Sequence, residues 1–288
     1  MHEDWTSFTG NFWTEFWLRP GRKWTQWVSQ RALDNLGLFL VFSILLFSLP
    51  LASAQTRRSA TEFLSSDLQA QQADDGANPG MLWVGQGAKL WSAPPATEGK
   101  KSCAGCHGDT ADTMKGAATR YPQVDPAAGQ LLNLEGRINH CRTTRQGLPA
   151  LAYETDDLLG LTAFVAHQSR GLSIQPSIDG PAAPFFETGK AFYFQRQGQL
   201  NVSCAQCHDD RAGNRLRGDT ISSGLTGAYP AYRLDWQKTG SLHRRLRACA
   251  LGVRAVQLPA GSPEYLALEL YLNWRGTGTP IETPGLRK

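Results

Sequence analysis

Apolar positions recur with helical spacing in two stretches, and each stretch has its own start and stop signals. The first helix is predicted to begin at Thr155, just before two aspartates, and to end near Gly171. The second is predicted to begin at Ser262, followed by a proline and Glu264, and to end near Gly276. In each helix three apolar residues fall at i, i+3 and i+7: Leu158, Leu161 and Val165, then Tyr265, Leu268 and Leu272. We expect these faces to pack on the core.

A shorter amphipathic stretch precedes each of these helices by several tens of residues. The sequences are Gly-Ala-Lys-Leu-Trp at 87–91 and Gly-Lys-Ala-Phe-Tyr at 189–193, and both predict a short helix. The same set of features therefore occurs twice along the chain. Between them lie long segments rich in Gly and Pro, where the pattern places no strand with confidence.

An uncharged apolar run spans residues 36–51, follows four basic residues and precedes an Ala-Ser-Ala site ending at Ala54. This arrangement predicts a cleaved signal peptide at 1–54 and a periplasmic protein. The alternative is an uncleaved membrane anchor, although sixteen residues fall short of the roughly twenty that span a bilayer. We expect membrane contact only through this segment.

The 234 residues after the signal peptide are enough for two domains of about 100 residues each. We predict an N-terminal arm at 55–80 with a weak helical run at 61–73, a first domain at 81–174, a proline-rich linker at 175–184 and a second domain at 185–288. The net charge of +4 is small, and nothing in the pattern predicts a nucleic-acid partner.

The strongest chemical signal is the motif Cys-x-x-Cys-His, which occurs once in each predicted domain. Its residues are Cys103, Cys106 and His107 in the first copy and Cys204, Cys207 and His208 in the second. Two thiols at this spacing attach a c-type haem, and the following histidine is its proximal ligand. A structural zinc or local disulfides would use the cysteines but would leave both histidines unexplained. The sequence thus predicts a mainly α protein of two tandem cytochrome c-type domains with long haem-binding loops, carrying two haem c groups.

The second axial ligand of each iron must come from elsewhere. No methionine follows the second motif, whereas Arg-x-x-x-Cys follows both, ending at Cys141 and Cys249. We expect these two thiolates to be the distal ligands, with His107 and His208 opposite them. Three alternatives remain: a disulfide between the two cysteines, ligation by His140 and His243, or inert buried thiols.

Cys249 lies in a basic segment. Residues 243–254 hold four arginines and no acid: Arg244, Arg245, Arg247 and Arg254. Arg233 and Arg275 are further candidates for the same patch. A solvated basic face is the ordinary interpretation of such a run. Beside a free cysteine, the arginines would also bind oxyanions and favour the thiolate, so we assign chemistry to Cys249 and electron storage or structure to Cys141.

These motifs resemble the SoxA family of dihaem cytochromes, most closely at Arg245-x-x-x-Cys249 and at residues 261–276 (GSPEYLALELYLNWRG). The resemblance implies an L-cysteine S-thiosulfotransferase that joins thiosulfate to a cysteine of the carrier SoxYZ, with a SoxX-like monohaem cytochrome c as partner. It also implies that Cys249 is catalytic, as a haem ligand carrying a persulfide, and that Arg245 binds substrate. We add Arg247 as a second substrate-binding residue.

Two other functions compete with this interpretation. A thiosulfate dehydrogenase would release tetrathionate, but such enzymes tend to place methionine on the second haem. A non-enzymatic electron carrier would have bis-histidine haems and would tolerate loss of Cys249.

Overall fold

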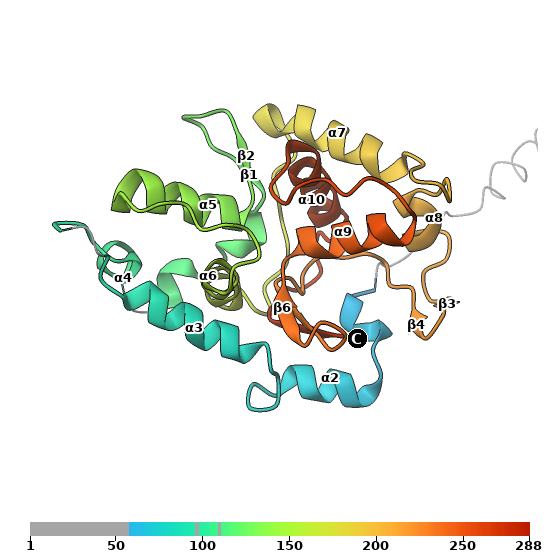
Figure 1. Ribbon diagram of the computed structural model, residues 1–288, viewed down its shortest axis with the longest axis horizontal. Helices are drawn as coiled ribbons and strands as arrows, with labels where there is room; N and C mark the ends of the chain where they lie inside the picture. The colour runs from blue at the N-terminus through green and yellow to red at the C-terminus, as the bar shows by residue number, and fades with distance from the viewer. Residues whose placement is uncertain (1–57, 96–97, 109–110) are drawn as a thin grey trace, which may run out of the picture. The chain divides into compact units, whose positions relative to one another are not determined.

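Two pairs of packed helices form the frame of the protein (Figure 1). The computed structural model describes residues 58–95, 98–108 and 111–288, so the predicted signal peptide lies outside the described residues. Helix α3 (Met81–Ser92) packs along α6 (Asp156–His167), and α7 (Ala183–Phe194) packs along α10 (Pro263–Arg275). These are the four helices that the hydrophobic pattern predicts.

The start signals of the two long helices act as predicted. The Ser262 hydroxyl accepts a hydrogen bond from the Tyr265 N–H, and Pro263 opens α10. Helix α6 begins directly after Thr155 and ends four residues before Gly171, earlier than we predict. All six apolar positions are buried, from Leu158 through Leu272. Both predicted core faces are therefore confirmed.

Each helix pair crosses at a glycine. A Cβ atom at Gly87 would collide with the Gly160 carbonyl of α6, and one at Gly189 would collide with the Ala267 carbonyl of α10. The two glycines occupy equivalent places in the two repeated stretches. The backbones thus approach more closely than any side chain would permit, and this fixes each crossing.

The remaining helices are short and carry most of the chemical residues. The haem-motif residues form single helical turns, α4 (Cys103–His107) and α8 (Cys204–His208). The two Arg-x-x-x-Cys segments lie on α5 (Leu134–Cys141) and α9 (Leu242–Gly252), for which the sequence pattern predicted no helix. A π-helical turn at Arg142–Gln146 continues α5, and 3-10 turns lie at Ala111–Met114, Ala118–Arg120 and Gly180–Ala182.

Three small sheets occupy the segments where we placed no strand. Antiparallel pairs join β1 (Gln123–Val124) to β2 (Leu131–Leu132) and β3 (Arg215–Leu216) to β4 (Asp219–Thr220). In the third sheet β5 (Ala231–Arg233) lies between β6 (Lys238–Gly240), which is antiparallel to it, and β7 (Gly285–Arg287), which is parallel. The third sheet places Arg233 directly opposite Arg287 in register.

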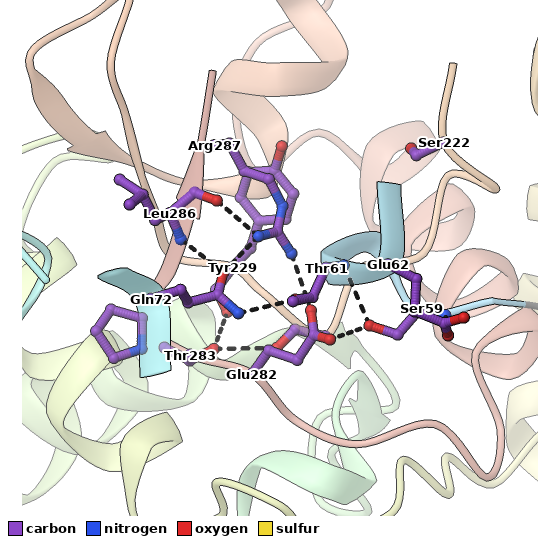
Figure 2. Close-up of polar contacts among 12 residues, drawn as sticks. Ser59, Thr61, Glu62, Gln72, Ser222, Tyr229, Glu282, Thr283, Leu286 and Arg287 are labelled. Atoms are coloured by element: carbon purple, nitrogen blue, oxygen red, sulfur yellow. Dashed lines mark hydrogen bonds and ion pairs between the residues drawn. The ribbon is translucent and has the colours of Figure 1, made fainter. Parts of the chain in front are cut away.

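The predicted arm contains a 3-10 turn (Ala60–Phe63) and helix α2 (Ser66–Ala73), close to the predicted run. Figure 2 shows how polar side chains join this arm to β7. The Gln72 side-chain oxygen accepts hydrogen bonds from the Leu286 N–H at 2.9 Å and from the Arg287 guanidinium at 2.5 Å. Glu282 pairs with Arg287 at 2.9 Å and also accepts from the Ser59 hydroxyl. The arm thereby supports the sheet that carries Arg233.

Residues 56–288 cluster as one compact unit, and the predicted boundaries within it stay predictions. In the part of the chain that the structure describes, no helix combines the length and the apolar character needed to cross a bilayer.

Candidate functional site

The second Cys-x-x-Cys-His motif is folded as a capped helical turn. The Ser203 hydroxyl accepts from the Gln206 N–H, and the Gln206 side chain accepts from the Ser203 N–H, forming a capping box. Cys204, Cys207 and His208 all lie on this one turn, α8. In the first motif the Ser102 hydroxyl accepts from the Gly105 N–H in the same way. The serine before each motif therefore explains why both begin as helical turns.

The His208 ring is oriented by the loop that follows it. Its Nδ1 lies 2.8 Å from the Ser222 carbonyl oxygen, and because a carbonyl only accepts, Nδ1 carries the proton. Nε2 then carries the lone pair of the ring, the arrangement typical of histidines that ligate a metal. Gly224, at φ +70°, lies against the same ring: a Cβ there would be 2.9 Å from the His208 Cγ.

Arg275 fixes this loop from α10. Its guanidinium donates to the Ser223 carbonyl at 3.0 Å and pairs with Asp209, the residue after the motif. It also lies over the Tyr193 ring, and the Tyr193 hydroxyl bonds to Asp209 at 3.1 Å. Arg275 is thus a buried residue of α10 that holds the loop in place. It does not belong to the basic patch around Cys249, for which the sequence analysis named it as a further candidate.

Cys249 lies beside His208 and one turn after Arg245 on α9. Burial raises the pKa of its thiol, but a hydrogen bond with His208 and the charge of Arg245 outweigh burial and hold the pKa below its ordinary value. The structure therefore brings together three of the residues that the sequence analysis selects for this site. The thiolate is the form that ligates iron and attacks sulfur.

A second arginine contributes to this effect from a different element. Arg233 of β5 also lowers the Cys249 pKa, and its guanidinium is held by Asp235 at 3.1 Å and lies over the Trp236 ring. Arg247 is exposed on α9, two residues from Cys249, and its role as a substrate-binding residue stays a prediction. The basic surround of Cys249 thus includes Arg245 and Arg233.

The first motif has a different environment. Burial raises the pKa of the Cys141 thiol, and the charges of Arg137 and Arg145 offset this only in part. Arg137, the equivalent of Arg245, pairs with Asp125 at 2.8 Å. The thiols of the motif are close by, since Cys106 contributes to the pKa of Cys141. The residues meet at this site too, but its arginine already has an acidic partner.

The structure contradicts the disulfide, whereas ligation by His140 and His243 stays an alternative. All six cysteines are free thiols, so Cys141 and Cys249 do not form a disulfide. His243 is 1% exposed, and both of its ring nitrogens have neighbours: Nδ1 accepts from the Gly261 N–H at 2.8 Å, and Nε2 lies 3.0 Å from Glu269. His140 is partly buried at the end of α5.

The donor set fits a c-type haem. Free thiols at Cys204 and Cys207 stand on one helical turn with His208, whose Nε2 is left available, and the Cys249 thiol lies beside that ring. Thiol pairs for covalent attachment, an imidazole and a second sulfur donor are the groups that such a haem requires. In the first motif Cys103, Cys106 and His107 offer the same types of group, with Cys141 nearby.

Comparison with known proteins agrees with this chemistry. Residues 86–174 match the family model described as SoxA/TsdA, cytochrome c domain. The L-cysteine S-thiosulfotransferase subunit SoxA of Rhodovulum sulfidophilum is 40% identical over 230 residues, 80% of each chain. The chain belongs to the SoxA family. The SoxA subunit of Paracoccus pantotrophus is 37% identical over 80% of this chain and 78% of its own.

A solved structure extends the SoxA likeness to three dimensions. The crystal structure of SoxXA from P. pantotrophus matches with a TM-score of 0.77 and 37% identity, covering 81% of this chain and 87% of the other. Like other members of the SoxA family, the chain is a c-type cytochrome that binds haem c.

Sequence reasoning missed the groups that orient His208. Ser222 and Gly224 lie in a loop without periodicity, and their role depends on how that loop returns to α8. A glycine shortly after the haem motif is a weak sign that the chain turns back toward the histidine. Arg233 was only a further candidate, because its approach to Cys249 depends on the unpredicted strand β5.

Proposed function

We propose that the protein couples thiosulfate oxidatively to a cysteine of a SoxYZ-like carrier in the periplasm, as a dihaem subunit paired with a SoxX-like monohaem cytochrome c. The observation that carries this proposal is the Cys249 thiol, which lies between His208 and Arg245 and has a lowered pKa. The names of the SoxA relatives and of the SoxXA complex support it.

In this proposal His107 and Cys141 would ligate the iron of the first haem, and His208 and Cys249 would ligate that of the second. Cys103 and Cys106 attach the first haem, and Cys204 and Cys207 the second. When bound, the haem groups supply one-electron acceptors. Arg245 and Arg233 bind the sulfonate oxygens of thiosulfate in two-point fashion and direct its terminal sulfur toward Cys249.

The coupling balances as two steps at Cys249. First, a sulfur–sulfur bond forms between the Cys249 thiolate and the terminal sulfur of thiosulfate, and two electrons leave to the haem acceptors. Second, the carrier thiolate attacks that same sulfur, so the thiosulfonate group passes to the carrier and Cys249 leaves as a thiolate. The lowered pKa of Cys249 suits both steps, because it favours the attacking form and the leaving form.

Exposed apolar side chains near the site offer a surface for the carrier. Leu251 is 63% exposed and Val256 80% exposed, and both follow Cys249 closely in the chain. Leu200, 54% exposed, is joined to the same segment because its N–H donates to the Val253 carbonyl. Exposed apolar groups beside a reactive thiol are typical of a protein contact surface.

The experiment that tests the proposal mixes purified holoprotein with thiosulfate, reduced carrier and oxidised partner cytochrome. Mass spectrometry should show one thiosulfonate group added to the carrier cysteine and two electrons delivered per group. Tetrathionate formed at the same rate without the carrier would favour the thiosulfate dehydrogenase function instead.

Electron paramagnetic resonance of the oxidised holoprotein tests the ligand sets. Two low-spin signals with the narrow g-spread of thiolate ligation are expected. Bis-histidine signals would contradict the assignment of Cys141 and Cys249 and would favour a plain electron carrier.

A further inference from the structure

A group of acidic side chains lies between helices of the two repeats, apart from the arginines of the second site. Glu135 of α5 is 6% exposed, and Glu269 of α10 and Glu154 of the loop before α6 lie close enough to raise its pKa. His243 of α9 is the basic side chain that faces them. Three carboxylates thus share a buried region with one imidazole.

The neighbours of this group fix its members in place. The Asn133 side chain donates to Glu269 at 3.1 Å and accepts from the Tyr153 hydroxyl at 3.1 Å. The Ser241 hydroxyl donates to Glu154. Tyr153 also stacks on the His243 ring at 5.9 Å between centroids. These contacts orient Glu269 and Glu154 but none of them reaches the Glu135 carboxyl.

His243 is held in one tautomer. The Gly261 N–H donates to Nδ1 at 2.8 Å, so the single ring proton lies on Nε2, which faces Glu269 at 3.0 Å. Burial lowers the pKa of His243, but Glu269, with Glu135 and Glu154, outweighs burial and holds that pKa above its ordinary value. A proton that enters this group while Nδ1 accepts the Gly261 N–H therefore binds to a carboxylate.

Glu135 is the carboxylate with room for that proton. Its carboxyl group accepts a hydrogen bond from its own backbone N–H, and no side chain among the described residues is seen to donate to it, although the residue is only 6% exposed. It lines a cavity of about 50 Å³ together with Glu269, Thr162, Thr226 and Asn273. A water molecule needs roughly 10–15 Å³ of such space, so the polar cavity has room for water that could carry protons.

The electrostatics agree with this geometry. Burial and then the charge of Glu269 raise the pKa of Glu135 to about 7, against a smaller opposing effect of His243. Glu135 is therefore poised to gain or lose a proton near neutral pH. Any nearby change of charge will then move that proton.

Helix α9 connects this group to the second site. His243 and Cys249 are six residues apart on it, about 9 Å along the axis at a rise of about 1.5 Å per residue. At an effective dielectric constant of about 20, one unit charge placed on the order of 10 Å from a carboxylate changes its affinity for a proton by about one pKa unit.

We propose that Glu135 and Glu269 form a buried proton-binding site, which takes up one proton from water through the cavity when an electron enters a haem held by His208 and Cys249. The inference rests on the proposed function, which places that haem there and supplies the electron from thiosulfate. The balance is one electron to the haem and one proton to the carboxylate pair, with the reverse on reoxidation.

The test is a potentiometric titration of the thiolate-ligated second haem in the holoprotein, repeated between about pH 5 and pH 9. In the wild type the reduction potential should fall as the pH rises. The total fall should be about 59 mV for each unit by which the pKa of the carboxylate site differs between the oxidised and the reduced haem. In Glu135→Gln this fall should be lost. Glu264→Gln, an exposed change on the same helix as Glu269, should leave it unchanged.

Glu269→Gln keeps the test decisive if Glu135→Gln folds poorly. Because the Glu269 charge raises the Glu135 pKa, removing that charge should lower the pH range over which the reduction potential changes. A wild-type potential that does not change with pH, or a window that Glu269→Gln does not move, would overturn the inference.

A second measurement does not involve the haem electron. Since the folded pKa of Glu135 is raised from 4.5 to about 7, its contribution to stability is present below pH 4.5 and is lost as the pH rises toward 7. The melting temperature of Glu135→Gln, relative to that of the wild type, should therefore increase as the pH rises through this window. Melting temperatures that depend on pH in the same way in both proteins would contradict the proton-binding site. Coupling activity that survives Cys249→Ser would refute the proposed function and leave this titration standing.

Discussion

The two repeats share their framework and differ in the environment of one thiol. In both, a glycine crossing fixes a helix pair, and an aromatic residue, Trp91 or Tyr193, bonds to the residue after the motif histidine. Yet burial raises the pKa of Cys141, whereas His208 and Arg245 lower that of Cys249. The comparison indicates that one framework repeated twice can give its two thiols opposite pKa shifts, since Arg137 is paired with Asp125 whereas Arg245 acts on Cys249.

The largest expected effect is the difference between serine substitutions at the two thiols. Cys249→Ser should reduce the rate of thiosulfate coupling by at least about 1,000-fold, because it removes the attacking sulfur. Cys141→Ser should leave the rate within about tenfold, since that thiol only tunes electron storage. Steady-state reduction of the partner cytochrome measures both. Equal losses in the two variants would mean that the repeats do not divide their roles as proposed.

Arg245 provides the next largest contrast. Arg245→Ala should lower kcat/KM for thiosulfate by about 100-fold, because a charged donor to the substrate and the positive charge that lowers the Cys249 pKa are both lost. Arg245→Lys should recover part of the loss. Arg247→Ala is the matched control on the same helix and should retain nearly full activity. A comparable loss in that control would place Arg247 in the substrate site after all.

Gly224 tests whether the loop around His208 matters. Gly224→Ala should cost about 1–3 kcal/mol in the free energy of unfolding, because φ is positive and the new Cβ meets the His208 ring. Thermal melts measure the cost, and the resonance spectrum of the second haem should shift while that of the first stays unchanged. Gly213→Ala, at a positive φ with open space around it, separates backbone strain from contact with the ring.

Arg233 should give the smallest effect of the four. Arg233→Gln should lower kcat/KM by about tenfold, because a single charge is lost at the edge of the site while Arg245 remains. The loss should appear mainly in KM. A decrease confined to kcat would indicate that Arg233 acts on the electron-transfer step instead.

Local patterns were enough to predict the helix pairs and the haem motifs. Ser262, Pro263 and Gly276 act within a few residues of themselves, so their effect on α10 follows from the sequence alone. The strand β5 and the loop at Ser222 depend on contacts with segments far along the chain, such as β7 and Arg275. Arg233 and Gly224 therefore could not be assigned from spacing. Helical geometry places Arg245, four residues before Cys249, on the same side of α9 as the thiol, while the role of Arg247 in substrate binding stays a prediction.

The glycine crossings at Gly87 and Gly189 have a consequence for the speed of electron exchange. Where two backbones touch, a helix pair has no side chain whose rearrangement could absorb a change of charge. The turns α4 and α8 follow α3 and α7 along the chain, so we expect the frame beside them to change little in shape when the charge at a bound haem changes. With such a frame the reorganisation energy is expected to be small, and electrons would pass to a partner at little cost in nuclear motion.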